Sequence, residues 1–279
     1  AAVRRGALPR GEEEPELPAL LAEVVAAGKL VATTSAAALG EVDALLVCVD
    51  TPAPARAPVL DRLRSALEAA GPALREGALV VVESTLPPGT MDRLVVPALE
   101  ASSGRRVGEG IFAGHCPERV MTGKLLENLR SVARVCGGTT EETARAMIAL
   151  YARVVRAPLE AADCVTAEIV KTAENAYRDV NIAFANELAR VCEASGADFP
   201  RVRALVNRSP GRDVLWAGAG VGGPCIPKDP WLLLAAAPAG AGALLRAARD
   251  VNDAMPLHLA ALVEGALEEA GRALEGARV

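Results

Sequence analysis

The chain has 279 residues, of which 51% are hydrophobic and 23% are charged, a balance typical of a globular protein with a large core. Its formal net charge of −5 argues against broad binding to nucleic acid, which requires a basic surface, whereas a small anionic ligand needs only a few local cations. The most apolar run, residues 231–245, contains proline and glycine and is too short to span a membrane.

Short apolar runs alternate with helical patterns over the first half of the chain. Helical periodicity covers residues 15–30, where Gly28 is the predicted end. Strands are predicted within residues 42–52, 78–83 and 130–138, and helices over 57–75, 91–102 and 139–154. Thr90 is the predicted N-cap of the second of these helices, and Thr139 or Thr140 that of the third. Buried strands that alternate with helices favour an α/β fold built on a parallel sheet.

Helical patterns dominate the second half. Residues 165–196 form one predicted helix of roughly 30 residues, or about 45 Å, which ends at Gly196. A second helical stretch, a loop over residues 220–230 and a helix over 243–274 follow, and residues 274–279 are predicted to begin another strand. Because the first of these helices is so long, we expect it to cross a domain boundary or an oligomer interface.

One face of the long helix is polar. Its polar residues fall within about 80° of one another at about 100° per residue: Lys171, Asn175, Arg178 and Asn186. A solvated surface is the ordinary interpretation of such a face. Apolar residues such as Ile169 and Phe184 are spread around the helix, however, and leave little of it to face water. Buried Lys and Asn side chains need partners, and a bound ligand is one candidate.

Six cysteines are present, and their spacing contains no C-x-x-C pair and no zinc module: Cys48, Cys116, Cys136, Cys164, Cys192 and Cys225. We therefore predict no metal site, and reduced, mostly buried thiols in a cytoplasmic protein. Cys225 differs from the others because glycines and prolines surround it in GVGGPCIPKDP. His258, one of two histidines, is predicted to be structural.

The same loop contains a G-x-G-x-x-G match at Gly218, Gly220 and Gly223. No predicted strand precedes it, and the sequence PCIPKDP that follows cannot begin the required helix. We therefore expect the phosphate-binding turn of a dinucleotide domain to be absent from this chain.

Five segments together resemble the UDP-glucose/GDP-mannose dehydrogenase family. They are ESTLPPGT, HCPERVMTGKLLENLR, AEIVKTAENAYRDVNIAFANEL, GVGGPCIPKDPWLL and ARDVNDAMP, and they follow the order of the family over almost the entire chain. The resemblance implies an incomplete Rossmann-like NAD-binding domain at residues 1–160 and an all-helical central domain at 161–270, through which the chain forms a homodimer. It further implies the start of a truncated UDP-binding domain at 271–279.

The resemblance also implies an activity, the oxidation of a primary alcohol of a UDP-sugar to a carboxylate with two molecules of NAD. Cys225 matches the family nucleophile, which captures the aldehyde as a thiohemiacetal and then carries a thioester. Lys171 and Asn175 match the pair that stabilises the oxyanion. Glu118 matches the glutamate implicated in hydrolysis of the thioester.

Further site residues are implied in the same way. Two match residues that position an active-site water: Thr85 and Asp229. Contacts to the substrate are predicted at Arg119, Arg178, Asn186, Arg212, Gly222 and Arg249. Contacts to NAD are predicted after two strands and in the cysteine loop: Thr51, Ser84, Thr85 and Lys228. A structural ion pair or helix cap is the alternative role for four of these residues: Arg119, Asn186, Arg212 and Arg249.

The motifs favour UDP-N-acetylmannosamine as the substrate, because YRDVNIAFANE and PERVMTGK are closest to that branch of the family. Pro224 departs from that branch and Lys228 is closer to the glucose branch, so UDP-glucose and UDP-N-acetylglucosamine stay open. Two further alternatives are a β-hydroxyacid dehydrogenase, which also places Lys and Asn four residues apart on a helix, and an inactive fragment that only dimerises.

Overall fold

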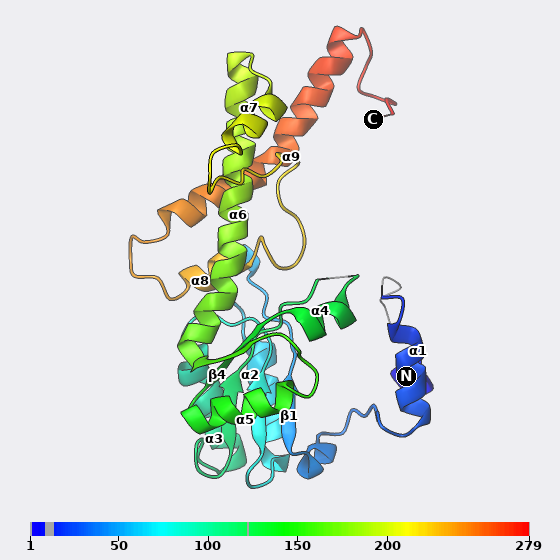
Figure 1. Ribbon diagram of the computed structural model, residues 1–279, viewed down its shortest axis with the longest axis vertical. Helices are drawn as coiled ribbons and strands as arrows, with labels where there is room; N and C mark the ends of the chain where they lie inside the picture. The colour runs from blue at the N-terminus through cyan, green and yellow to red at the C-terminus, as the bar shows by residue number, and fades with distance from the viewer. Residues whose placement is uncertain (1, 9–13, 122, 279) are drawn as a thin grey trace. The chain divides into compact units, whose positions relative to one another are not determined.

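A computed structural model of the chain describes residues 2–8, 14–121 and 123–278. They form two compact units, Ala1–Lys171 and Thr172–Val279, which are described separately (Figure 1). The first unit contains a sheet and its helices, and the second is helical within its described residues. The predicted α/β fold with a following helical domain is confirmed.

The sheet has five strands in the described residues, in the order β1-β2-β3-β4-β5: β1 Ala44–Val47, β2 Leu79–Val82, β3 Phe112–His115, β4 Arg134–Gly138 and β5 Leu159–Asp163. The first three strands are mutually parallel, β4 is antiparallel to β3, and β5 is parallel to β4. The predicted parallel sheet is therefore confirmed for β1–β3 and for the pair β4–β5, and it is wrong for the pairing of β4 with β3. Among its described residues, the connection before β4 contains the short helix α4 (Leu125–Ser131), and the chain then returns beside β3 in the opposite direction.

The apolar strand β2 is buried on both faces. Val80 and Val82 pack with helices α2 (Asp61–Ala70) and α3 (Val96–Ser103) on one side of the sheet. Leu79 and Val81 pack on the other side with Met147 of helix α5 (Glu141–Tyr151). A strand covered by helices on both faces has no solvent side, which explains its uninterrupted apolar sequence.

Of the two predicted N-caps, one is confirmed and one is wrong. Thr140 caps α5, since its hydroxyl accepts a hydrogen bond from the N–H of Thr143. Thr90 does not cap the helix that follows it, because its hydroxyl donates instead to the carbonyl of Pro87. The Glu168 carboxylate takes the acceptor role and receives the N–H groups of Gly89 and Met91.

Shorter elements complete the first unit. Helix α1 (Leu17–Ala26) confirms the predicted N-terminal helix, and Gly28 adopts a positive φ of 67° just beyond it. The remaining turns of helix are η1 Val3–Arg5, η2 Ala36–Glu41, η3 Pro54–Arg56, η4 Gly71–Ala73 and the π-helical η5 Met91–Val95, which leads into α3.

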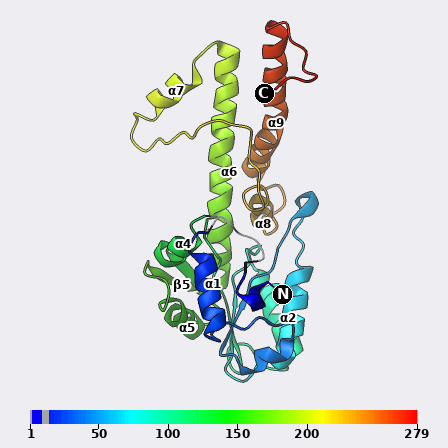
Figure 2. The ribbon, with the colours of Figure 1, turned by 90° about the vertical axis from the view of Figure 1, so that its right-hand side faces the viewer.

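The second unit contains α7 (Phe199–Val206), α8 (Asp229–Leu234) and α9 (Ala243–Glu269), together with most of α6 (Cys164–Ser195). Helix α6 ends before Gly196, as predicted, and α9, which crosses it in Figure 1 and lies to its right in Figure 2, contacts it through Asn252 and Arg249. The predicted strand at 274–279 is wrong for residues 274–278, which form a turn and irregular chain, because a strand needs a partner and the described part of this unit offers none; Val279 lies outside the described residues. No helix in the described part of the chain is long and apolar enough to cross a membrane.

Candidate active site

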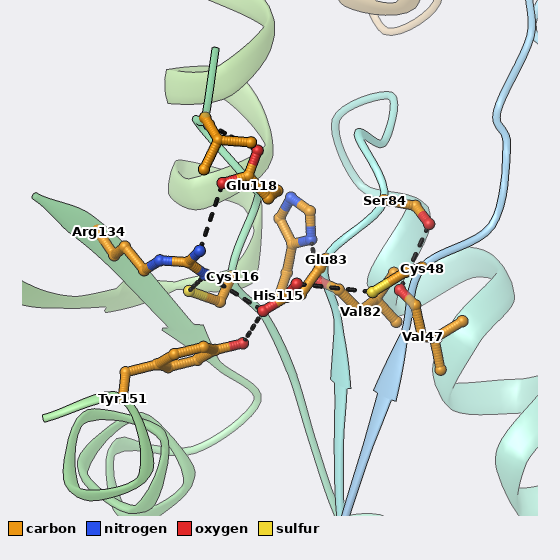
Figure 3. Close-up of polar contacts among 11 residues, drawn as sticks. Val47, Cys48, Val82, Glu83, Ser84, His115, Cys116, Glu118, Arg134 and Tyr151 are labelled. Atoms are coloured by element: carbon orange, nitrogen blue, oxygen red, sulfur yellow. Dashed lines mark hydrogen bonds and ion pairs between the residues drawn. The ribbon is translucent and has the colours of Figure 1, made fainter. Parts of the chain in front are cut away.

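Polar residues from four segments meet at one edge of the sheet in the first unit (Figure 3). We call them the strand-end cluster: Glu83, Cys116, Glu118, Arg134 and Tyr151. Glu83 follows β2, and Cys116 and Glu118 follow β3, whereas Arg134 begins β4. Because β4 is antiparallel to β3, its first residue lies at the edge where β2 and β3 end. The unpredicted strand direction thus creates the cluster.

Arg134 is the centre of the cluster. Only 4% of its side chain is exposed, and its guanidinium lies 3.2 Å from Glu83 and 3.4 Å from Glu118. Its Cζ atom is also 4.9 Å from the centre of the Tyr151 ring. A buried guanidinium is costly unless opposite charges and hydrogen bonds surround it, and these three neighbours supply both.

Glu83 holds the buried side of the cluster. Its Oε1 atom accepts a hydrogen bond of 2.5 Å from the Tyr151 hydroxyl, and its Oε2 atom accepts one of 3.5 Å from the Cys48 thiol. Although Cys48 is exposed as a whole residue, desolvation of its thiol, together with the charge of Glu83, raises the pKa of Cys48 to about 11. Burial and the charges of Cys116 and Glu83 likewise raise the pKa of Tyr151. Both groups therefore remain protonated donors to Glu83 at neutral pH.

Glu118 occupies the open side of the cluster, with 32% of its side chain exposed. Arg134 contacts its Oε1 atom, and the N–H of Val120 donates to its Oε2 atom over 2.6 Å. Its own N–H donates to the carbonyl of Glu83. A carboxylate that is fixed at both oxygens and still reaches solvent has the geometry of a proton acceptor for water.

Loops after β1 and β2 carry the predicted NAD contacts of the first unit. Ser84 Oγ donates to the carbonyl of Val49 over 2.7 Å and accepts from its N–H over 2.8 Å, while the Thr51 hydroxyl donates to the carbonyl of Thr85 over 2.7 Å. These bonds join the two loops at the carboxyl ends of the strands, where α/β sheets bind ligands. Contact of these residues with NAD stays a prediction.

Four predicted residues meet in the second unit. Cys225 is exposed, and its carbonyl accepts the N–H groups of Lys228 and Asp229, each over 3.0 Å, in the turn that begins α8. The Asp229 carboxylate is buried and accepts from Asn175 over 2.5 Å and from Lys228 over 2.6 Å. Lys171 lies one turn before Asn175 on α6. The loop therefore carries an exposed thiol four residues before a buried, oriented carboxylate.

Glycine has a structural role at Gly220 in this loop. Its φ is +88°, and a Cβ atom there would lie 2.2 Å from the carbonyl oxygen of Asn252 on α9. A Cβ atom at Gly222 would meet no heavy atom within 4 Å, so the chain is open at that position. Gly220 thus allows the loop to pack against a helix, which does not require a substrate.

Two predicted substrate contacts belong to a buried polar network. Asn186 donates to Asn252 over 2.9 Å and accepts from the N–H of Gly218 over 2.9 Å. Arg249 lies 2.6 Å from Asp179 and also pairs with Asp253. These contacts favour the structural alternative for Asn186 and Arg249, and their contact with substrate stays a prediction.

The other predicted residues lie apart from this network. Arg178 and Arg212 are exposed, and Arg212 donates to the carbonyl of Pro210. Arg119 donates to the carbonyl of Ala133 over 2.8 Å. His258 pairs with Glu193 over 2.7 Å, in agreement with a structural role. Four of the six cysteines are buried, as predicted.

Comparisons with known proteins identify the family. The sequence profile of the UDP-glucose/GDP-mannose dehydrogenase family, NAD binding domain, matches residues 2–155, and that of the central domain matches residues 165–254. The chain belongs to this family. Its first unit therefore contains the NAD-binding domain of the family, and the predicted family is confirmed.

Individual relatives are similar over most of the chain. The UDP-N-acetyl-D-mannosamine dehydrogenase of Pyrococcus horikoshii is 39% identical over 92% of the chain and 61% of the relative. The NDP-N-acetyl-D-galactosaminuronic acid dehydrogenase of Ralstonia solanacearum is 41% identical over 87% of the chain and 58% of the relative. The solved structure of the Pyrococcus UDP-D-ManNAc dehydrogenase has a TM-score of 0.91 at 37% identity, and the match covers 97% of the chain and 64% of that structure. The chain thus spans about three fifths of the length of these relatives.

Proposed function

We propose that the protein oxidises the primary alcohol of a UDP-sugar to a carboxylate in two NAD-dependent steps. The observation that carries this proposal is the exposed Cys225 beside Asp229, Asn175 and Lys228 in a member of this dehydrogenase family. Thr51, Ser84, Thr85 and Lys228 would hold NAD, which would supply the hydride acceptor for each oxidation.

Cys225 acts between the two oxidations. Its sulfur adds to the carbonyl carbon of the aldehyde, whose oxygen takes a proton, and the product is a thiohemiacetal. Loss of a hydride and a proton from this adduct leaves a thioester. A water molecule then adds to the thioester carbonyl, the carbon–sulfur bond breaks, and the carboxylate and the free thiol result.

Residues of α6 and α8 support this chemistry. Lys171 and the Asn175 amide are one turn apart on α6 and supply a cation and a donor for the oxyanion. The buried Asp229 carboxylate fixes the orientation of the Asn175 side chain through their hydrogen bond. With Thr85, Asp229 is proposed to position the attacking water, whose proton passes to Glu118.

The substrate that we favour is UDP-N-acetylmannosamine. This choice is supported by the Pyrococcus relative, which is 39% identical and is named UDP-N-acetyl-D-mannosamine dehydrogenase. The 41% identical Ralstonia relative supports a second candidate, a sugar nucleotide of the N-acetylgalactosamine series. Pro224 and Lys228 of the cysteine loop keep the glucose series as a third.

A homodimer formed through the central domain is part of the proposal. Apolar side chains repeat every seven residues on one face of α6 and are exposed, namely Tyr177 at 73%, Phe184 at 55% and Val191 at 56%. This face lies opposite the one that carries Lys171 and Asn175. A second copy of the chain that covers the stripe would remove it from water and leave the polar face available.

Mass spectrometry and NADH detection test the activity. Full-length protein is mixed with NAD and each candidate sugar nucleotide, and we expect two NADH per molecule of the preferred sugar. Cys225→Ser should abolish this yield or arrest the reaction at the aldehyde. Full activity in Cys225→Ser would favour a β-hydroxyacid type of dehydrogenase, and no NADH from any sugar would favour an inactive dimerising fragment.

A further inference from the structure

The strand-end cluster contains more charge than the proposed chemistry uses. One buried cation, Arg134, lies between two carboxylates, Glu83 and Glu118. Glu118 alone is assigned to hydrolysis, so the remaining charges require an explanation. Removing these ions from water costs free energy, and their mutual attraction and hydrogen bonds must offset that cost. Such a cost suggests that the buried charges have a role of their own.

The two carboxylates differ in their surroundings. Only 12% of the Glu83 side chain is exposed, against 32% of Glu118. Glu83 accepts hydrogen bonds from Tyr151, Arg134 and Cys48, so its oxygens are occupied by protein donors. Glu118 has one oxygen towards Arg134 and the other towards the N–H of Val120. Glu83 therefore anchors the arginine, and the arginine reaches Glu118.

The remaining neighbours keep this arrangement rigid. Tyr151 places its ring beside the guanidinium and its hydroxyl on Glu83, so it orients both ions. Cys116 lies 3.8 Å from an Arg134 nitrogen on the third side. His115 bonds through Nδ1 to the carbonyl of Val82, and burial lowers its pKa to about 4, so it adds no charge near neutral pH.

We propose that Arg134, held by Glu83 and Tyr151, positions the Glu118 carboxylate for hydrolysis of the thioester. This inference rests on the proposed function, because it assigns a role within that reaction. In the step concerned, the water oxygen bonds to the thioester carbon and Glu118 accepts a water proton. The sulfur leaves with the electron pair of the carbon–sulfur bond. Arg134 touches no reacting atom and acts only by fixing one oxygen of Glu118.

If Arg134 positions Glu118, removing Arg134 should slow only the hydrolysis of the thioester. The two hydride transfers precede hydrolysis, so a displaced Glu118 should leave NADH formation in the first turnover intact and slow the release of the carboxylate. In Arg134→Met we expect a first-turnover burst of two NADH at the normal rate. We further expect steady-state turnover at least tenfold slower, with KM lowered in the same proportion because the steps that set kcat/KM are unchanged, and a thioester adduct on Cys225 in the intact mass.

Four other variants complete the comparison. Arg134→Lys, which keeps a cation at the site, should restore part of the hydrolysis rate. Tyr151→Phe and Glu83→Gln change the anchor by single polar groups and should each slow hydrolysis severalfold, so that the proposal stays testable if Arg134→Met fails to fold. Arg145→Met removes an exposed arginine of α5 that pairs with Glu141, and it should behave as the unmodified protein.

Failure of this inference differs from failure of the proposed function. If Glu118→Gln accumulates the thioester while Arg134→Met and both anchor variants hydrolyse it normally, the positioning role is refuted and the reaction stands. A slowed NADH burst in these variants, with no trapped adduct, would show general damage to the unit and also refute the role. If the unmodified protein forms no NADH, or Glu118→Gln hydrolyses normally, the assignment in the proposed function itself is wrong.

Discussion

The pKa of the Cys48 thiol depends on the charge of Glu83, so this contact can be tested without an enzymatic assay. Its thiol donates to Glu83, and burial followed by the charge of this carboxylate raises its pKa to about 11. Glu83→Gln removes the charge but keeps the shape. The pKa of Cys48 should then fall, although it stays above its ordinary value because the burial remains.

The expected result is faster alkylation of Cys48 by iodoacetamide at pH 8, since the thiolate is the reacting species. We expect a rise of severalfold, measured by peptide mass spectrometry during a time course. Cys225, exposed in the other unit, is the internal reference and should keep its rate. An unchanged rate at Cys48 would contradict the contact with Glu83.

At the scale of elements, Glu168 of α6 fixes the turn that leads into α3. Its carboxylate accepts the N–H groups of Gly89 and Met91 and is fully buried. Burial outweighs these bonds and raises its pKa from 4.5 to about 7. A raised pKa in the folded state means that Glu168 favours folding below pH 4.5 and that this contribution is lost as the pH rises towards 7.

Glu168→Gln should therefore change the pH dependence of stability. The melting temperature of the unmodified protein minus that of the variant is expected to decrease between pH 4.5 and 7.5, on the order of 5 °C. Differential scanning calorimetry at several pH values measures it. The exposed Glu187→Gln, also on α6, is the matched control and should show no such trend. A constant difference across this range would contradict the raised pKa.

At the scale of the whole molecule, sequence reasoning could group site residues only where they are close together in the chain. Asp229 follows Cys225 by four residues, and Asn175 follows Lys171 by one helical turn, so both pairs are visible in single motifs. The buried strand β2 was also recognisable, because four consecutive apolar residues filled it.

The strand-end cluster could not be predicted in this way. Glu83 and Arg134 are 51 residues apart in the chain and meet only because β4 runs antiparallel to β3. Strand β3 was missed, since FAGH lacks an apolar run, and β5 was missed because LEAAD has no β-branched residue. A signal that could have indicated the cluster is Arg134 itself, a charge at the start of an otherwise apolar strand.

The sequence pattern also suggests that the chain forms a homodimer, which a measurement of its mass in solution can test. Exposure of Tyr177, Phe184 and Val191 along one face of α6 leaves an apolar stripe of the kind that a partner usually covers. Phe184→Arg places a charge in its middle. If two copies pack through this stripe, the unpaired charge would be buried, so the variant should dissociate.

Light scattering coupled to size-exclusion chromatography should give the mass of a dimer for the unmodified protein and that of a monomer for Phe184→Arg. Leu257→Arg is the control, because Leu257 is 78% exposed on α9 and undergoes the same apolar-to-charged change. It should remain dimeric. A dimeric Phe184→Arg would move the interface away from this stripe, and a monomeric unmodified protein would refute the homodimer. Dissociation in Phe184→Arg alone would assign the two faces of α6 to separate tasks, the polar face to chemistry and the apolar face to assembly.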